Sequence, residues 1–241
     1  MSASLLPILA GDTPGERLAS LRAALPGRIV FTTSFGIEDQ ALTHEIFSRD
    51  LAIDLVTIDT GRLFLETYEL WQETEARYGR RIRSVHPDAA ALAAMVADSG
   101  INGFYFSKEA RLNCCAVRKV EPLNHALAGA FAWVTGLRAD QSDERGAVTL
   151  VSRDPERGLI KVAPLFDWSR DAVAEFCAAH KVPVSALHNF GYASIGCAPC
   201  TRAIQPGESE RAGRWWWEKD EARECGLHVG ADGRLQRSRA A

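Results

Sequence analysis

Short runs of β-forming residues alternate with longer runs of helical periodicity through about the first 180 residues of this chain of 241. Alternation of this kind is typical of a mostly parallel sheet covered by helices, because parallel neighbours are joined by long crossovers that are usually helical. The predicted strands cover residues 28–33, 52–58, 81–85, 131–136 and 159–164. The predicted helices cover residues 38–49, 62–79, 89–98, 107–128 and 168–180. The sequence therefore predicts an α/β fold.

The pattern changes at about residue 182, where loops rich in glycine, proline and polar residues begin. At roughly 150 residues per domain, the length corresponds to between one and two domains, enough for one full-sized core. We predict an α/β domain over residues 1–181 and a loop-rich C-terminal segment over residues 182–241. The segment is expected to be an appendage, so that the chain forms one structural domain overall.

Charge and hydropathy exclude several classes of partner. Lys and Arg total 28 against 31 Asp and Glu, a formal charge of −3, which is too near balance for a general nucleic-acid binder. The longest apolar run, Ala89–Ala97, has nine residues, about half of what a bilayer span requires. The N-terminus has no basic region before its short apolar stretch, as an export signal would. We expect a cytoplasmic protein without nucleic-acid or membrane partners, and the sequence leaves homo-oligomerisation open.

The first predicted strand leads into the turn TTSFGIEDQ, in which Gly36 allows a close turn and Glu38 begins a helix. Backbone N–H groups and the positive end of that helix would suit a phosphate or sulfate oxygen. The alternative is that Ser34 and Gly36 are ordinary turn residues, which is the commoner case. Neither a Walker A lysine nor a G-x-G-x-x-G pattern follows, and this argues against ordinary P-loop and Rossmann sites.

The second predicted strand ends at Ile58 and Asp59, and Gly61 opens the next helix in the segment TIDTGRLFLET. Ligands of open α/β sheets bind at the carboxyl ends of the strands, so this turn and the first would lie beside one nucleotide. A role for Asp59 as a helix cap is an equally good interpretation.

Four of the six cysteines fall in two close groups, NCCAVRK and GCAPC, and Cys197 lies 82 positions after Cys115. The four are Cys114, Cys115, Cys197 and Cys200. In a reducing compartment this pattern favours metal ligands over inert core residues. Thiolates bind both zinc and iron–sulfur clusters. Neighbouring cysteines on one helix point about 100° apart, which would strain a compact zinc site, whereas a larger cluster spans the gap more easily.

Arg118 and Lys119 follow Cys114 and Cys115 by four residues each. Residues four apart on a helix lie on the same face, so both cations would lie over the cysteines. We expect Lys119 to offset the charge of an anionic cluster and to reach a bound sulfate. A solvated basic face is the alternative for such a pair.

Two further motifs lie near the C-terminus, RAGRWWWE and ECGLH. Arg211 and Arg214 are three residues apart and suited to bind one tetrahedral anion. Trp215–Trp217 are expected to be packing anchors rather than a platform for base stacking. Cys225 is a candidate nucleophile, because a neighbouring cation such as protonated His228 favours the thiolate.

Seven segments together resemble, in the expected order, the assimilatory adenylyl-sulfate (APS) reductases within the family of APS and phosphoadenylyl-sulfate (PAPS) reductases. They extend from about Phe31 to His228 and are TTSFGIEDQ, IDTGRLFLET, NCCAVRK, TGLRADQS, GCAPCTR, RAGRWWWE and ECGLH. The resemblance implies an adenine-nucleotide α-hydrolase-like fold with a modified PP-loop. The pattern S-G-G-x-D-S of ATP pyrophosphatases would place Gly at Phe35, Asp at Glu38 and Ser at Asp39. This departure argues against cleavage of ATP to pyrophosphate.

The resemblance also implies roles for individual residues. Cys114, Cys115, Cys197 and Cys200 would bind a 4Fe-4S cluster, and the catalytic residues would be Cys225, as the nucleophile, and His228. The substrate-binding set would come from both turns, one lysine and three arginines: Ser34, Phe35, Gly36, Glu38, Asp59, Thr60, Gly61, Lys119, Arg138, Arg211 and Arg214.

The implied reaction is the reduction of APS to sulfite and AMP in sulfate assimilation toward cysteine, through an S-sulfocysteine on Cys225 and with reduced thioredoxin as electron donor. PAPS-specific relatives commonly lack the four cluster cysteines, so APS is favoured, and a PAPS or dual reductase is the alternative. Two other classes are an ATP pyrophosphatase that thiolates or adenylates a substrate, and a non-catalytic iron–sulfur sensor in which Cys225 would be dispensable.

Overall fold

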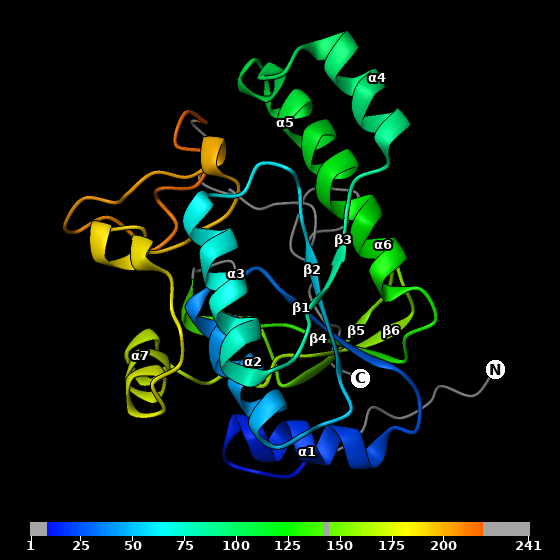
Figure 1. The fold of residues 1–241 in the computed structure, drawn as a ribbon, viewed down its shortest axis with the longest axis vertical. Coiled ribbons are helices and arrows are strands. Elements are labelled where there is room, and N and C mark those ends of the chain that lie inside the picture. The colour runs from blue at the N-terminus through cyan, green and yellow to red at the C-terminus, as the bar shows by residue number, and fades with distance from the viewer. Residues whose placement is uncertain (1–8, 142–144, 219–241) are drawn as a thin grey trace.

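The computed structural model describes residues 9–141 and 145–218, and within these ranges the chain forms one six-stranded sheet (Figure 1). The strand order is β3-β2-β1-β4-β6-β5. The strands are β1 (Ile29–Thr33), β2 (Asp54–Ile58), β3 (Arg83–Val85), β4 (Ala132–Val134), β5 (Val151–Asp154) and β6 (Leu159–Val162). All neighbours pair in parallel except β5, which is antiparallel to β6. The predicted α/β fold is confirmed, and β5 is the strand that the sequence interpretation missed.

The helices surround this sheet. They are α1 (Pro14–Ala24), α2 (Ile37–Ser48), α3 (Leu65–Tyr78), α4 (Ala89–Ser99), α5 (Lys108–Cys115), α6 (Glu121–Leu127) and α7 (Arg170–Ala179). The helix α1 was not predicted, although Thr13 and Glu16 form a capping box around Pro14, which is a signal for a helix start. Within the described ranges, none of the helices combines the length and apolarity needed to cross a membrane.

The helix predicted over residues 107–128 is interrupted by a π-helical turn, Ala116–Val120, between α5 and α6. The physical reason is Pro122, which lacks the N–H that an α-helix would bond to the carbonyl of Arg118 and whose ring would clash with that carbonyl. A π turn is wider than an α turn and is often found at functional sites. It carries Arg118 and Lys119 directly after the cysteine pair.

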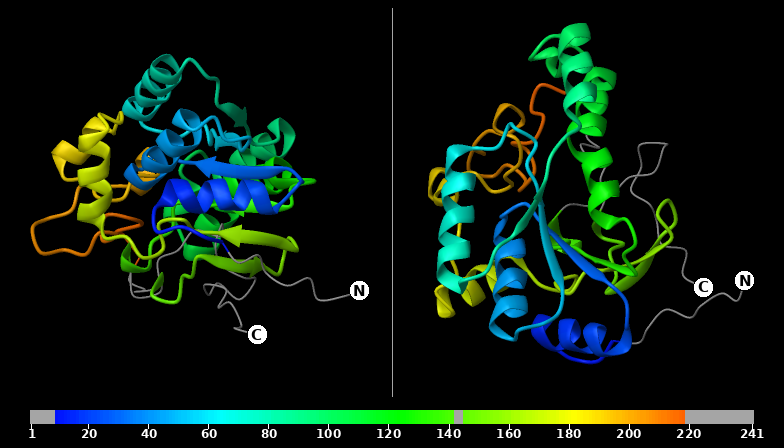
Figure 2. Two further views of the ribbon diagram at one scale, coloured as in Figure 1. Left: turned by 90° about the horizontal axis from the view of Figure 1, so that it is seen from below. Right: turned by 45° about the vertical axis from the view of Figure 1, so that its right-hand side comes forward.

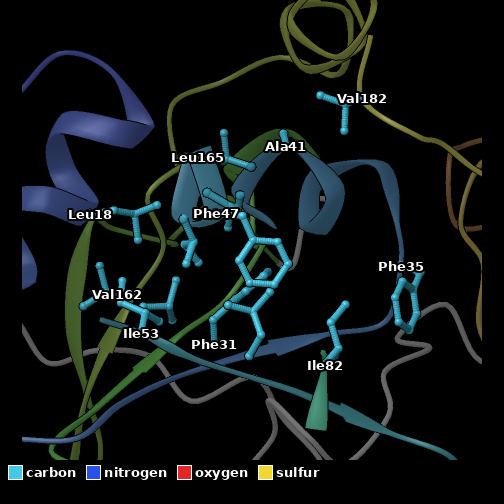
Figure 3. Packing of buried hydrophobic residues seen from close by; sticks show 14 of the residues in the cluster. Leu18, Phe31, Phe35, Ala41, Phe47, Ile53, Ile82, Val162, Leu165 and Val182 are labelled. Atoms are coloured by element: carbon cyan, nitrogen blue, oxygen red, sulfur yellow. The ribbon is translucent and has the colours of Figure 1, made fainter. Parts of the chain in front are cut away.

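Strand side chains point alternately to two faces of the sheet, and both faces are covered. Phe31 of β1 packs in the larger core cluster with Leu18 of α1 and Phe47 of α2 (Figure 3). Val30 points to the opposite face and packs with Leu123 of α6. Figure 2 shows these two helical layers on either side of the strands. Burial on both faces explains why β4 and the first three residues of β1 are continuously apolar.

The direction in which the sheet grows reverses at β1. From β1 the chain adds β2 and then β3 on one side, and it later adds β4 on the other side of β1. In open α/β sheets such a reversal leaves a crevice outside the carboxyl ends of the two central strands, and ligands bind there. The topology therefore predicts a ligand site at the turns that follow β1 and β4.

Candidate active site

A cavity of about 200 Å³ lies at the carboxyl ends of β1, β2 and β4. Its wall includes the threonines at these strand ends, the turn after β1, the π turn and parts of the C-terminal segment. Nine of the residues predicted from the sequence line it: Ser34, Phe35, Gly36, Glu38, Thr60, Lys119, Cys197, Arg211 and Arg214. Residues from both predicted turns and from the C-terminal motifs thus surround one space.

The turn after β1 contains Phe35 in the left-handed region of backbone space, with φ 60°. This conformation costs an L-residue roughly 1–2 kcal/mol. The ring of Phe35 is buried and stacks on Trp71 of α3, with the ring centroids 5.7 Å apart. Burial of the aromatic ring offsets the backbone cost, so the turn holds a phenylalanine where the pyrophosphatase pattern has a glycine.

Asp39, in the first turn of α2, is hydrogen-bonded to the turn that precedes this helix. Its Oδ2 accepts hydrogen bonds from the backbone N–H of Ser34 at 2.6 Å and from the Ser34 hydroxyl at 2.8 Å. Burial raises the pKa of Asp39 to about 7, the Ser34 hydrogen bonds oppose that rise, and the charge of Glu38 adds to it. A Cβ on Gly136, after β4, would lie 2.4 Å from Asp39 Oδ1, so a glycine is required there.

Only part of the turn after β2 faces the cavity, and the rest forms hydrogen bonds within the protein. Asp59 Oδ1 accepts from the N–H of Gly61 and from the hydroxyl of Tyr68 in α3, each at 2.8 Å, and it does not cap α3. Neither Asp59 nor Gly61 is among the residues that line the cavity. Thr60 does line it, and its hydroxyl lies 3.3 Å from Cys197 Sγ.

The four cysteines predicted as ligands come together from two distant parts of the chain. Cys114 and Cys115 end α5, Cys197 precedes a short 3-10 turn, Ala198–Cys200, and Cys200 is the last residue of that turn. Cys197, Cys200 and Trp215 belong to one buried cluster against which Cys114 packs. All four are free thiols. Across the described ranges, no group of three or more His, Cys, Asp or Glu side chains is placed to hold a metal ion.

Cations from two elements act on these thiols. Burial alone would raise the pKa of Cys197, but Lys119, the Thr60 hydroxyl and Arg214 together hold that pKa below its ordinary value. Burial raises the pKa of Cys200 to about 12, with the charge of Cys197 adding to the rise and Lys119 opposing it. The π turn and the C-terminal segment therefore supply positive charge to the same group of sulfur atoms.

Three buried N–H groups beside the thiols have no hydrogen-bond acceptor among the described residues. They are Arg214 Nε, Trp215 Nε1 and Trp217 Nε1. A buried donor without an acceptor costs about 1–3 kcal/mol. The thiols, the nearby cations and the unpaired donors are chemically suited to an anionic, acceptor-rich group such as an iron–sulfur cluster, although the thiols of the described residues are not placed as a ligand set in this structure.

The three tryptophans differ in their surroundings. Trp215 is buried, and two guanidinium groups lie over its ring, with Arg111 at 4.6 Å and Arg214 at 4.8 Å from the centroid. Trp217 packs against aromatic neighbours next to the cysteines, whereas Trp216 is 38% exposed. The prediction of packing anchors is confirmed for Trp215 and Trp217.

Arg214 reaches the cysteines because the main chain makes room for it. It forms an isolated antiparallel bridge with Thr201, directly after Cys200. A Cβ on Gly196 would lie 2.2 Å from the Arg214 guanidinium, so the glycine before Cys197 is needed for this close approach.

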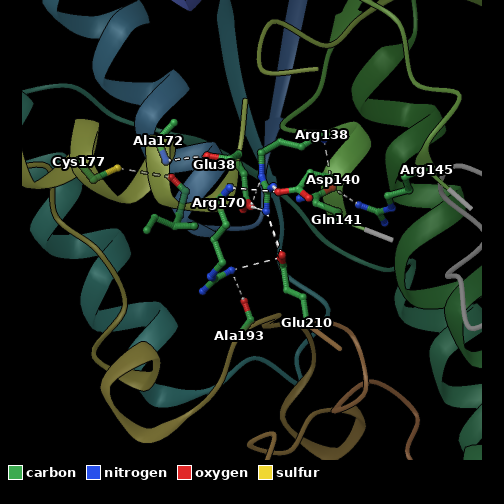
Figure 4. A network of polar contacts seen from close by, with 12 residues as sticks. Glu38, Arg138, Asp140, Gln141, Arg145, Arg170, Ala172, Cys177, Ala193 and Glu210 are labelled. Atoms are coloured by element: carbon green, nitrogen blue, oxygen red, sulfur yellow. Dashed lines mark hydrogen bonds and ion pairs between the residues drawn. The ribbon is translucent and has the colours of Figure 1, made fainter. Parts of the chain in front are cut away.

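Arg138 lies inside the protein rather than in the cavity wall (Figure 4). Its guanidinium donates to Glu38 at 2.9 Å, to Glu210 at 3.0 Å and to Asp140 at 3.1 Å. Glu210 also pairs with Arg170 at 3.2 Å. In this structure the N–H groups of Arg138 donate to carboxylates of the protein itself. The sequence prediction placed this arginine in the substrate-binding set.

Several cavity residues were not predicted from the sequence. They are, among others, Asp39, Arg145, His188 and Glu210. Asp39 directly follows the predicted residue Glu38, and Glu210 directly precedes the predicted residue Arg211, so both could have been found from their neighbours. Arg145 and His188 lie in no recognisable motif. The predicted catalytic residues Cys225 and His228 lie outside the described residues, and their roles remain predictions.

Comparison with known proteins agrees with these observations. The sequence pattern of the phosphoadenosine phosphosulfate reductase domain matches residues 28–203. The adenosine 5'-phosphosulfate reductase of Agrobacterium fabrum is 54% identical over 228 residues, which is 95% of this chain and 87% of that protein. The protein of the same name from Rhizobium meliloti is 56% identical over 213 residues, 88% of this chain and 80% of that protein.

Among solved structures, the phosphoadenylyl-sulfate (PAPS) reductase from Candida auris, in a phosphate complex, matches with a TM-score of 0.67 and 24% identity. The match covers 80% of this chain and 90% of that chain and confirms the fold class. Because the domain pattern covers most of the chain and the named relatives are more than half identical to it, this chain belongs to the phosphoadenosine phosphosulfate reductase family and is an oxidoreductase enzyme.

Proposed function

We propose that this enzyme reduces adenylyl sulfate to sulfite and AMP in the assimilation of sulfate toward cysteine. The observation that carries the proposal is that Lys119, Arg211 and Arg214 line one cavity with the turn after β1 and with Cys197. Three cations at the carboxyl ends of the strands suit a phosphosulfate group. Relatives that are 54–56% identical and named adenosine 5'-phosphosulfate reductase support this choice of substrate.

We infer that Cys114, Cys115, Cys197 and Cys200 hold a 4Fe-4S cluster. The inference is supported by their free thiols, by the packing of Cys114 against Cys197 and Cys200, and by the unpaired N–H donors beside them. When bound, such a cluster would cross-link α5 to the C-terminal segment and place negative charge next to Lys119 and Arg214. The electrons of the reaction are expected from dithiol chemistry, so the cluster needs no change of oxidation state.

The proposed first step is nucleophilic attack by the Cys225 thiolate on the sulfur of the sulfate group. The bond between that sulfur and the bridging oxygen breaks, its electron pair leaves with AMP, and an S-sulfocysteine forms on Cys225. Lys119, Arg211 and Arg214 would stabilise the charge that develops on the leaving phosphate and on the transferring sulfonate. His228 would favour the thiolate form of Cys225 when it is protonated.

The proposed second step uses an external dithiol protein of the thioredoxin type. One of its thiolates attacks Cys225 Sγ, which releases sulfite and leaves a mixed disulfide. The second thiol of the donor then attacks the donor's own sulfur atom in the mixed disulfide. This releases the Cys225 thiol and leaves the donor as a disulfide, oxidised by two electrons. This chemistry requires a reducing compartment, for which we propose the cytoplasm.

The experiment that tests the proposal is mass spectrometry of the protein after anaerobic mixing with adenylyl sulfate and no reductant. We expect one added sulfonate group, located on Cys225 by peptide analysis, and none in the Cys225→Ser variant. Unmodified Cys225, in protein whose absorbance shows a bound cluster, would contradict the mechanism. Turnover with PAPS in place of APS then tests the alternative substrate.

A second experiment tests the proposed role of Lys119. The Lys119→Ala variant should lose rate of sulfonate transfer to Cys225 more than it loses affinity for AMP, because the lysine is expected to act on the sulfate end. Equal losses in transfer rate and in AMP affinity would contradict that role.

A further inference from the structure

Four large apolar side chains lie exposed beside the end of the described C-terminal segment. They are Ile101, Tyr105, Phe106 and Trp216, which are 58%, 39%, 84% and 38% exposed, and we call them the apolar patch. Trp217 links its two parts, because the centroid of its ring lies 4.5 Å from that of Tyr105 and 4.9 Å from that of Trp216. Figure 1 shows the connection between α4 and α5, which carries the first three residues, beside this segment.

The packing of α5 does not account for the exposure of Phe106. Phe106 directly precedes Ser107, which is the N-cap of α5. An apolar residue at this position often packs against the fourth residue of the helix. Here the fourth residue is Arg111, whose guanidinium donates to the carboxylate of Glu218 at 2.6 and 3.0 Å. Clusters of exposed apolar side chains often mark interaction sites, and aromatic residues are enriched in protein–protein interfaces.

The same ion pair fixes the point from which the chain leads to the candidate nucleophile. Glu218 is the last described residue, and Cys225 follows it by seven positions. Seven residues span at most about 25 Å, so Cys225 lies within that distance of Glu218. Trp215, which lines the cavity, precedes Glu218 by three positions, a span of at most about 11 Å. A thiol on this tether can therefore reach both the cavity and the apolar patch.

We propose that the apolar patch is the docking surface for the external dithiol protein that reduces the S-sulfocysteine. The inference rests on the proposed function, in which a thiolate of the donor attacks Cys225 Sγ. The bond from Sγ to the sulfonate sulfur breaks, and sulfite leaves with the electron pair. A donor that is bound within reach of the tether presents its thiol at a high effective concentration. A small dithiol needs no such surface, because it reaches Sγ by diffusion.

The size of the apolar patch favours this partner over a second copy of the chain. Four exposed side chains are far fewer than the roughly 20–30 residues that each partner contributes to a stable complex. An electron donor has to leave after each turnover, and a small surface suits such a transient partner.

The test compares two reductants on protein that already carries the sulfonate. The S-sulfocysteine is formed anaerobically with adenylyl sulfate, the nucleotide is removed, and sulfite release is followed with reduced thioredoxin or with dithiothreitol. The double variant Ile101→Ser/Phe106→Ser should lower the second-order rate constant with thioredoxin at least about tenfold, the effect of losing one central interface side chain. Its rate with dithiothreitol should be unchanged. At saturating thioredoxin its rate should approach that of the unchanged protein, because only docking is weakened.

Phe131→Ser is the matched control, because Phe131 is also 58% exposed but directly precedes β4, whose opposite, carboxyl end faces the cavity. It should alter neither rate. Equal losses with both reductants in the double variant, or no loss with thioredoxin, would overturn the inference and leave the proposed function standing.

Sedimentation velocity tests the alternative occupant. A change of oligomeric state in the double variant would overturn the inference, since the apolar patch would then bind a second copy of the chain. Absence of a sulfonate on Cys225 in the unchanged protein, or no release of sulfite from it by thioredoxin, would count against the proposed function and would overturn the inference with it.

Discussion

Replacement of Arg138 by methionine should destabilise the protein strongly. Arg138 is fully buried and joins Glu38, at the start of α2, to Glu210 in the C-terminal segment. Methionine keeps most of the length of the side chain but removes the positive charge. Among the described residues, Glu210 would then retain only its pair with Arg170 at 3.2 Å. Removal of one partner from a buried ion pair costs about 3–5 kcal/mol, because the other charge stays buried without compensation. We expect a loss of that size in the free energy of unfolding of Arg138→Met.

The measurement is urea unfolding followed by tryptophan fluorescence under anaerobic conditions. With a slope of about 2–3 kcal/mol per molar urea, the midpoint should fall by about 1–2 M. Asp140→Asn is the control, since this partner is 60% exposed and the loss of an exposed pair costs at most about 1 kcal/mol.

A double variant sharpens this test. Glu210→Gln alone should destabilise the protein, but the same change added to Arg138→Met should restore stability, because it removes a carboxylate that has lost its main partner. An effect of Arg138→Met no larger than that of Asp140→Asn, or a further loss of stability in the double variant, would refute the reasoning. Glu210 directly precedes Arg211, so AMP affinity should also fall in Arg138→Met.

Three other changes have definite expected outcomes. Burial raises the pKa of Asp39 to about 7. The native state therefore keeps this proton up to about pH 7, whereas the unfolded chain releases it near pH 4. As the pH rises from about 4 to 7, the unchanged protein loses stability, because the unfolded chain ionises more easily than the native state. The free energy of unfolding of Asp39→Asn relative to the unchanged protein should therefore increase between pH 4 and 8, by up to roughly 4 kcal/mol, and a difference independent of pH would contradict this. Gly196→Ala should weaken AMP binding about tenfold or more, because its Cβ would lie 2.2 Å from the guanidinium of Arg214, and unchanged affinity in isothermal titration would show that Arg214 does not hold the phosphate. Trp215→Leu should cost about 3–5 kcal/mol in urea unfolding and Trp215→Phe less than half of that, since phenylalanine keeps a ring against the two guanidinium groups. Equal costs would exclude the stacking on Arg111 and Arg214 as a source of stability.

Much of the fold could be predicted because its signals are local. The five predicted strands all exist, and the apolar runs of the central strands β1 and β4 result from burial on both faces of the sheet. The strand β5 was missed because it is a short edge strand whose pairing with β6 is a tertiary contact. The break between α5 and α6 had a local signal in Pro122, which the periodicity of the surrounding run concealed.

The site could be predicted in part. Motif residues such as Lys119, Arg211 and Arg214 do line one cavity, because the π turn and the C-terminal segment both reach the carboxyl ends of β1, β2 and β4. Sequence reasoning could not predict that Arg138 is buried among carboxylates. It also could not predict that Asp39 fills the loop in which an anion was expected.

The sequence by itself determined the alternation of strands and helices, the two pairs of cysteines and the cationic motifs that follow them. These features depend on spacing along the chain, which sets the face of a helix or strand on which each side chain lies. Only the tertiary structure decided which of these charges face the cavity and which are bound within the protein, as for Arg138 and Asp39. The physical reason is that the burial and the partners of a charged group depend on neighbours from distant segments, and these set both its pKa and its availability to a ligand.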